Sequence, residues 1–359
     1  MEIYWQWLCG IPGLYQKEKG LLLQYFGTPE EVWRASERDC RKFGEAGYGW
    51  IQKVEKFRKE QDPESFSHRL ERIGIQFISQ SRTDYPEKLR RIADAPYGLF
   101  YRGSLPAPGA KQIAVVGARM CSRYGKEMAQ LVARAVAECG GELVSGCAYG
   151  IDGIAQMEAL DCGGSSYGIL GCGADRVYPS GNRVLFERLE KQGGLISEFP
   201  PGTGPLRYHF PLRNRLISGL SDVIVVVEAK RKSGSLITAD FAADQGRDVY
   251  AVPGRVGDEL SEGCNELISQ GAGIFLSVKQ FRDSVFQVEG DGKRRKSVQH
   301  SLAPSEKLVY SSLGFYSKSL SELQECTGLS LDELSTVLLS LEQKGLGRET
   351  DRNYYAKME

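Results

Sequence analysis

Residues 113–119, Ile-Ala-Val-Val-Gly-Ala-Arg, set a pattern that the middle of the chain repeats. An apolar run, short enough for one strand, ends in a loop that holds a glycine, and a helical pattern follows. Two further glycine loops come after such runs, Ser-Gly-Cys-Ala-Tyr-Gly at 145–150 and Ser-Gly-Ser at 233–235. If the runs are parallel strands, all three loops open onto the carboxyl edge of one sheet, where open α/β sheets bind ligands.

The same pattern predicts six strands with helices between them. The runs are short, apolar and mostly continuous, as expected for strands that are covered on both faces. They lie at 113–116, 142–144, 166–170, 195–197, 222–227 and 248–251. Between the first two, apolar residues recur at helical spacing over 124–139. Strands that alternate with helices predict right-handed βαβ units and an α/β fold with a largely parallel sheet.

The length of 359 residues predicts more than one domain. Residues 1–85 carry short helical patterns, and Gly-Ile-Pro-Gly-Leu at 10–14 fits either a helix-hairpin-helix turn or a plain helix connection. Residues 86–285 would form the sheet, and the basic stretch within 286–303 a linker. In 304–359 we expect helices at 305–313, 320–326 and 331–344 and a β-ribbon at 345–355, an arrangement that resembles a winged helix.

Composition narrows the class of protein. Lysine plus arginine and aspartate plus glutamate both number 46, so bulk charge does not drive nucleic-acid binding, although a local basic groove can still supply the affinity. No apolar run approaches the ~18 residues of a membrane span, and the amino terminus lacks a secretory pattern. The nine cysteines stand singly beside only three histidines, so we expect no metal, no other cofactor and a cytoplasmic location.

The segment 207–215, Arg-Tyr-His-Phe-Pro-Leu-Arg-Asn-Arg, carries three arginines beside an aromatic residue. Arg213 and Arg215 fall in the first turns of a predicted helix, where the helix dipole disfavours positive charge. Cations at that end therefore indicate an external anion, and Phe210 could stack on a base, as in proteins that hold single strands. The alternative is that Phe210 belongs to the core and that the arginines pair with Asp222 or Glu228.

Several enzyme classes are disfavoured by spacing. The chain has no Gly-x-x-x-x-Gly-Lys-Ser/Thr loop, no Gly-x-Gly-x-x-Gly at the first turn, and Ser145 where a dinucleotide site needs an acidic residue. Binding without turnover is therefore the favoured interpretation. Two alternatives stay open: a Rossmann-type enzyme that binds or hydrolyses nucleoside phosphates, and a scaffold whose carboxyl-terminal unit alone contacts DNA.

Eight motifs in order resemble the DprA/Smf family of bacterial DNA-processing proteins. They cover about 96–274 and lie at 115–119, 144–152, 171–179, 197–199, 210–215, 233–239, 247–254 and 263–268. The resemblance implies an extended Rossmann-like core, binding of single-stranded DNA, loading of the RecA recombinase during natural transformation or recombination, and a homodimer. Three positions depart from what is usual in that family: Ala118, Tyr149 and Gln156.

Loops and resemblance together give one set of expected DNA contacts: Arg119, Ser145, Gly146, Tyr149, Arg207, Phe210, Arg213, Asn214, Arg215, Ser233, Gly234 and Ser235. The expected dimer surface lies near Leu267 and Ile268. No catalytic residue is expected.

Overall fold

The computed structural model describes residues 1–42, 48–286, 302–314 and 317–357. Two compact units make up the chain, Met1–Val288 and Glu289–Glu359. Residues 287–301 of the expected linker lie outside the described residues.

The first unit is built on a nine-stranded sheet of order β1-β2-β6-β5-β4-β3-β7-β8-β9. Strands β3 to β9 run parallel to one another, and β2 is antiparallel to both of its neighbours. This confirms the predicted Rossmann-like, largely parallel α/β fold. The strands are β1 (Gln76–Ser79), β2 (Gly98–Gly103), β3 (Gln112–Val116), β4 (Glu142–Ser145), β5 (Ser166–Ile169), β6 (Gly193–Ser197), β7 (Val223–Val226), β8 (Asp248–Ala251) and β9 (Gly273–Ile274).

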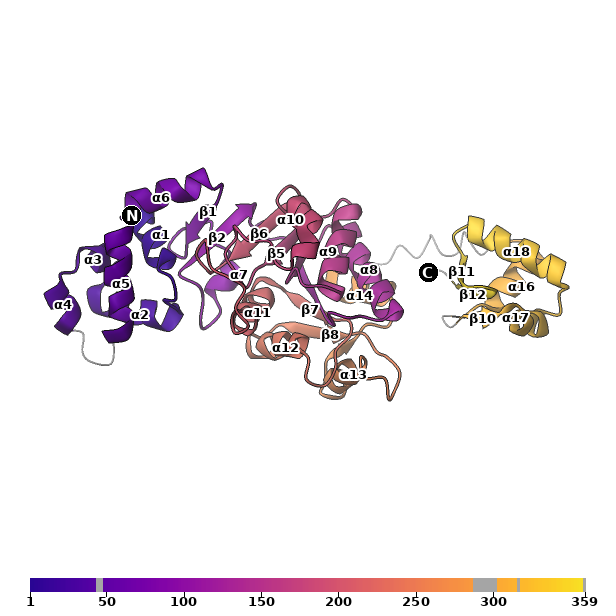
Figure 1. Cartoon of the computed structure of the whole chain (residues 1–359). Helices are drawn as coiled ribbons and strands as arrows, with labels where there is room; N and C mark the ends of the chain where they lie inside the picture. The colour runs from indigo at the N-terminus through magenta and orange to yellow at the C-terminus, as the bar shows by residue number, and fades with distance from the viewer. Residues whose placement is uncertain (43–47, 287–301, 315–316, 358–359) are drawn as a thin grey trace. The chain divides into compact units, whose positions relative to one another are not determined.

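Helices cover both faces of the sheet (Figure 1). On β3, Ile113 and Val115 pack on one face and Ala114 and Val116 on the other, because successive strand residues point to opposite sides. The first face is covered by α8 (Arg123–Glu138), α9 (Ile151–Asp161), α10 (Arg183–Leu189) and α14 (Val278–Phe286). The second is covered by α7 (Glu87–Arg90), α11 (His209–Leu220), α12 (Gly234–Asp244) and α13 (Glu262–Ser269).

The amino-terminal helices share a core with the β2–β6 end of the sheet. Trp7 and Phe66 belong to the same cluster of buried side chains as Phe100 of β2 and Leu195 of β6. Strand β1, on the amino-terminal side of the boundary expected at residue 85, pairs with β2 and belongs to the sheet. The helices are α1 (Glu2–Gly10), α2 (Gln16–Phe26), α3 (Pro29–Arg34), α4 (Glu37–Lys42), α5 (Tyr48–Glu60) and α6 (Pro63–Arg72).

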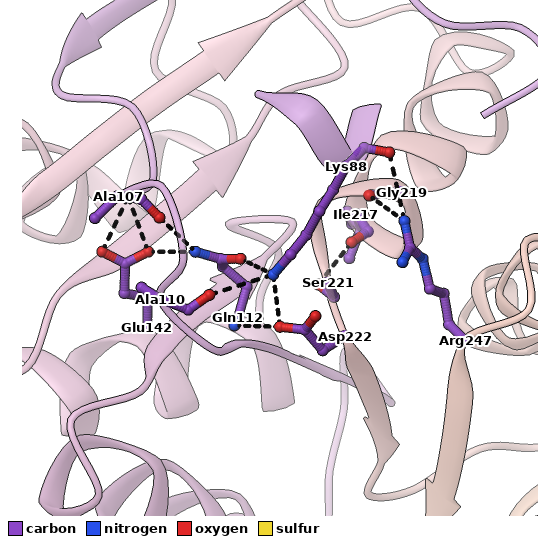
Figure 2. A network of polar contacts seen from close by, with 10 residues as sticks. All are labelled: Lys88, Ala107, Ala110, Gln112, Glu142, Ile217, Gly219, Ser221, Asp222 and Arg247. Carbon is purple, nitrogen blue, oxygen red and sulfur yellow. Dashed lines mark hydrogen bonds and ion pairs between the residues drawn. The ribbon is translucent and has the colours of Figure 1, made fainter. Parts of the chain in front are cut away.

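A network of polar contacts closes the amino edge of the sheet (Figure 2). Lys88 donates to the Asp222 carboxylate at 2.6 Å, and the backbone N–H of Gln112 donates to the same oxygen at 2.9 Å. The Gln112 side chain also donates to Glu142 at 2.7 Å. Because these partners satisfy one another, the amino edge holds the fold together and leaves ligand binding to the opposite edge.

The second unit has the predicted three helices and ribbon. Its buried core includes side chains from all three helices, among them Val309, Leu323, Leu334 and Leu341. Its elements are α16 (Pro304–Ser312), β10 (Lys318–Ser319), α17 (Leu320–Thr327), α18 (Leu331–Gln343), β11 (Gly347–Asp351) and β12 (Tyr354–Lys357), with strand order β10-β12-β11.

One carboxylate ties α16 to α18 within this unit. Glu306 accepts hydrogen bonds from Lys344 at 2.6 and 2.8 Å, from Ser340 at 2.6 Å and from the backbone N–H of Ala303 at 2.9 Å. These bonds, with the Lys344 bond contributing most, lower the pKa of Glu306 from its ordinary 4.5 to about 2. The ionised form is therefore the one that stabilises the fold.

The shift predicts an acid-sensitive second unit. Because the folded-state pKa is depressed, the stabilisation is fully present above the unfolded value of 4.5 and is lost as the pH falls toward about 2. Hydrogen exchange of α16 and α18 amides in the full chain should show protection that declines over this window. Glu306→Gln should lower protection at pH 7 and flatten the decline, whereas the exposed control Glu325→Gln should behave as wild type. An unchanged profile for Glu306→Gln would contradict the assignment.

Candidate nucleic-acid interface

The sheet has its topological switch point between β3 and β7. From β3 the chain adds β4, β5 and β6 on one side and, later, β7, β8 and β9 on the other. The loops that follow β3 and β7 therefore diverge at the carboxyl edge, and this is where parallel α/β sheets form their binding crevice.

Glu228 fills this crevice. Only 2% exposed, it accepts from the backbone N–H of Ser122 at 2.9 Å and from the Ser122 hydroxyl at 2.5 Å. Ser122 is the N-cap of α8, and its hydroxyl oxygen accepts from the N–H of Gly125 at 3.0 Å. The carboxylate thus occupies the position at a helix N-terminus where a dinucleotide fold holds a phosphate.

The loop between β4 and α9 is fixed from inside. Ser145 donates to the carbonyl of Val115 at 2.6 Å, and the N–H of Gly146 donates to Asp152 at 3.1 Å. Gly150 has φ 74°, and a Cβ there would lie 2.2 Å from the carbonyl oxygen of Ala118, so only glycine fits. The polar groups of Ser145 and Gly146 are buried and bonded within the protein, and the expected DNA contacts at these two residues stay a prediction.

Arg213 is buried behind this loop and is only 5% exposed. Its guanidinium donates to the carbonyl of Gly146 at 2.9 Å and also to the carbonyl of Ile169. Burial lowers the pKa of Arg213 and raises that of Asp152, and the charge of each opposes the shift of the other. Arg213 therefore braces the strand ends β4 and β5 from within, rather than lining an open groove as expected.

Arg215 is likewise internal, at 4% exposure. Its guanidinium contacts Glu198 at 2.5 Å and Asp94 at 2.9 Å. Burial raises the pKa of Glu198, and the charge of Arg215 opposes this. Arg215 therefore presents no exposed charge at this edge, and its expected DNA contact stays a prediction. The alternative is correct that arginines of this segment pair internally, but its partners are wrong, because Glu228 caps α8 and Asp222 binds Lys88.

Three side chains, two from loops and one from the first turn of α11, meet on the surface of the same edge. The Arg119 guanidinium lies 5.8 Å from the centre of the Phe210 ring. The Tyr178 ring, from the loop before the short helix η2 (Ser180–Asn182), lies 5.5 Å from Phe210 on centroid distance. Arg119 is exposed and Tyr178 is 39% exposed, while Phe210 is half-buried. We call Arg119, Tyr178 and Phe210 the rim cluster.

Two further predicted residues lie on the surface near these loops. Arg207, three residues before Phe210, is exposed, and Tyr149 is 49% exposed. Within the described residues, no carboxylate lies at ion-pair distance from Arg119 or Arg207. Their charges are therefore available to an outside anion, in contrast to those of Arg213 and Arg215.

Asn214 joins α11 to the start of α12. Its side-chain amide donates to the carbonyl of Gly234 at 3.1 Å. Ser233 is the N-cap of α12, and its hydroxyl lies 2.7 Å from that of Ser235, which is buried. Asn214, Ser233 and Gly234 thus keep some exposed surface at this edge, while Ser235 supports the turn from below.

Three further residues named from the sequence, Gln156, Leu267 and Ile268, pack against other parts of the protein. Gln156 is fully buried and accepts from the N–H of Cys147 at 3.1 Å, so it fastens the β4–α9 loop. Leu267 and Ile268 are half-buried on α13 against the core beneath it, and their role in a dimer stays a prediction. Tyr178 is not among the predicted contacts, although it falls in the motif at 171–179; an aromatic residue before Pro179 in a glycine-rich loop is the available signal.

Among the described residues, no group of three or more histidine, cysteine, aspartate or glutamate side chains is arranged to hold a metal ion. In the same part of the chain, no helix has the length and apolar character needed to cross a bilayer.

Because the Glu228 carboxylate lies against Gly125, we predict that a side chain at position 125 would displace it. A Cβ added there would lie 2.2 Å from a Glu228 carboxylate oxygen, so the carboxylate would have to move from the α8 N-terminus. Gly125→Ala should lower the free energy of unfolding by about 1–3 kcal/mol, measured by denaturant titration. Gly234→Ala, in the first turn of α12 with open space around it, is the matched control and should be neutral. Equal stability of both variants would show that Glu228 does not need this position.

Known proteins share this architecture. The profile of the family described as DNA recombination-mediator protein A matches residues 76–286. The DNA processing protein DprA of Streptococcus pneumoniae is 44% identical over 193 residues, which are 54% of this chain and 68% of that protein. The Smf protein of Escherichia coli is 45% identical over 204 residues, 56% of this chain and 54% of that protein.

Two solved structures of DNA processing protein A superpose on this chain. The X-ray structure of DNA processing protein A from Streptococcus pneumoniae superposes with a TM-score of 0.69 at 33% identity and covers 79% of this chain and 98% of that one. A structure addressing the single-stranded DNA binding mode of the Helicobacter pylori protein has a TM-score of 0.53 at 28% identity, covering 59% and 96%. With its sheet, its edge loops and its matched profile taken together, the chain belongs to the DNA recombination-mediator protein A family, known as DprA/Smf.

Proposed function

We propose that this chain binds single-stranded DNA across the rim cluster and acts as a recombination mediator without catalysing a reaction. The observation that carries this proposal is the exposed Arg119 guanidinium against the Phe210 ring, with Tyr178 beside it. A cation for phosphate and flat rings for bases are the two elements that sequence-tolerant single-strand binding uses. The named binding mode of the Helicobacter pylori relative supports the same ligand.

The position of Glu228 argues against the enzyme alternative. A nucleotide enzyme of this fold class places phosphate at the N-terminus of the first helix, and here a buried carboxylate already accepts those donors. A phosphate at that point would meet a like charge at close range. A strand that passes outside the crevice, over the rim cluster, avoids this conflict.

The wider role in this proposal follows from family membership. It comprises loading of the RecA recombinase onto the bound strand, a part in natural transformation or recombination, action in the cytoplasm, and a homodimer with Leu267 and Ile268 near its surface. The DNA contacts that we propose to retain from the predicted set are the exposed or half-exposed ones: Arg119, Tyr149, Arg207, Phe210, Asn214, Ser233 and Gly234.

Substitutions in the rim cluster test the binding mode. Phe210→Ala should weaken binding of oligo-dT by ~1–3 kcal/mol if the ring stacks on a base. Arg119→Ala should weaken binding and also reduce the slope of log K against log salt by about 0.7, the contribution of one phosphate contact on a single strand. Fluorescence anisotropy over a salt series measures both effects.

The matched control is Arg91→Ala. Arg91 is an exposed arginine just after α7, and its ion-pair partner among the described residues is Glu87 on its own segment. It should leave affinity and salt slope unchanged. If Arg119→Ala bound oligo-dT as wild type does, with the same slope, the proposed path over the rim would be wrong.

Two further comparisons separate the alternatives. A chain that lacks 304–359 should still bind oligo-dT, whereas loss of binding would favour a second unit that contacts DNA alone. Affinity should rise with oligomer length over several nucleotides, and incubation with nucleoside phosphates should release no product. Hydrolysis, abolished by Glu228→Gln, would instead support the enzyme alternative.

A further inference from the structure

A second polar site lies apart from the rim cluster, where the amino-terminal helices meet the sheet. It is a cavity of about 700 Å³, within the range of about 300–1,000 Å³ that small-molecule sites span. One wall comes from the α1–α2 turn, including Tyr15, and from α5 and α6. The other comes from residues 198–203 after β6 and from the start of α11.

Lys19 lines this cavity, and its charge opposes the burial-driven rise in the pKa of Glu198 on the facing wall. As a whole residue, Lys19 is only 5% exposed. Within the described residues, its ammonium group has no hydrogen-bond acceptor and no carboxylate at ion-pair distance. The ammonium nitrogen is thus left without a protein acceptor at the cavity wall, where an anion supplied from outside can bind it.

Arg215 provides a second donor at the same place. Two of its nitrogens are held by Asp94 and Glu198, but Nη1 is buried and has no hydrogen-bond partner. Arg215 also lines the cavity. Two independent side chains, one from α2 and one from α11, therefore leave donors unsatisfied around the same space.

Flat rings form part of the wall between them. Phe199 stacks on His209 with ring centroids 4.0 Å apart, and Tyr15 donates to the Tyr208 hydroxyl at 3.2 Å. All four line the cavity. The lining contains four cationic residues and three carboxylates: Lys17, Lys19, Arg69 and Arg215, and Glu60, Asp94 and Glu198. The lining therefore combines aromatic surface with one cation in excess.

We propose that this cavity binds one nucleotide, with its phosphate on Lys19 and its base against the ring wall of Phe199, His209, Tyr15 and Tyr208. A compact ligand with a flat ring and an anionic group matches both sets of side chains. An anion alone would leave the aromatic surface without a partner, and an apolar ligand would leave Lys19 and Arg215 unsatisfied.

Two backbone amides of the α1–α2 turn already have acceptors within the protein. Leu14 N–H donates to the carbonyl of Ile11, and Tyr15 N–H donates to Glu18 at 3.1 Å. These donors are therefore already used. In a helix-hairpin-helix turn, backbone N–H groups bind the phosphate. Here we assign the phosphate to Lys19, one turn into α2, rather than to these two amides.

The cavity adjoins the proposed DNA path along the chain. Leu206, Tyr208, His209 and Leu212 line it, and Arg207 and Phe210 of the proposed DNA path belong to the same stretch of chain. A strand that crosses Phe210 can therefore place a neighbouring nucleotide in the cavity. This source of the nucleotide rests on the proposed function, whereas a free mononucleotide would satisfy the same chemistry without it.

The test uses the full chain with dAMP, deoxyadenosine and inorganic phosphate as separate probes, each followed by calorimetry. Wild type should bind dAMP more tightly than either fragment, because both parts of the site contribute. Lys19→Met should weaken dAMP binding about tenfold or more, the effect of losing one hydrogen bond to a charged group. Lys191→Met removes an exposed charge just before β6, at the amino edge, and should leave dAMP binding unchanged.

Stability gives a readout that separates ligand binding from a structural role. Lys19→Met removes a charge that forms no hydrogen bond or ion pair within the described residues, so its thermal midpoint without ligand should stay close to that of wild type. A lowered midpoint would assign Lys19 to the fold and overturn the proposal. Failure of dAMP to bind wild type, equal binding of dAMP and phosphate, or unchanged binding by Lys19→Met would overturn it as well.

Oligo-dT distinguishes the two sources. If Lys19→Met weakens oligo-dT too, and dAMP competes with it, the nucleotide belongs to the bound strand; if only dAMP is affected, the site takes a free nucleotide. Both outcomes support the cavity chemistry. If dAMP fails while Arg119→Ala still weakens oligo-dT, the cavity proposal falls and the proposed function stands. If dAMP binds and oligo-dT does not, the cavity proposal stands and the proposed function falls.

Discussion

The buried carboxylate of Glu228 at the N-terminus of α8 is the constraint on which the carboxyl edge depends. It accepts the hydrogen bonds of Ser122 that a phosphate would otherwise take, and Gly125 leaves the space for it. The crevice between β3 and β7 is therefore closed by the protein itself. A fold that elsewhere holds nucleotides at this point has to present its ligand surface farther out, on the loops.

The arginines of α11 show how burial divides residues of one type between two tasks. Arg213 and Arg215 point into the protein, where they hold the ends of β4 and β5 and the carboxylates of Asp94 and Glu198. Fixing the helix from beneath sets the position of Phe210 at its start. Arg119 then contacts that ring from the loop after β3. Of the arginines predicted to contact DNA, Arg119 and Arg207 are exposed, whereas Arg213 and Arg215 are buried.

The amino-terminal helices extend this arrangement beyond the sheet. Their core is continuous with that of β2 and β6, so they form a wall against the segment that leads into α11. Lys19 and Arg215 face a common space across that wall and leave donors unsatisfied. The rim cluster and the cavity are thus joined by one stretch of chain, residues 206–212, in which some side chains line the cavity and others lie on the surface.

The sequence alone determined six of the nine strands of the sheet, β3 to β8, the helical pattern between them, and the three helices with a ribbon of the second unit, because apolar periodicity and glycine turns are local signals. It also determined which loops meet at the carboxyl edge, since parallel strands bring their ends together. It did not determine which charged side chains remain in water. Arg119 and Arg215 look alike in a sequence, and only the tertiary structure brings Asp94 and Glu198 to Arg215 while leaving Arg119 beside Phe210. The cavity around Lys19 likewise depends on segments about 180 residues apart, and no local pattern records that contact, because burial is a property of the packed chain.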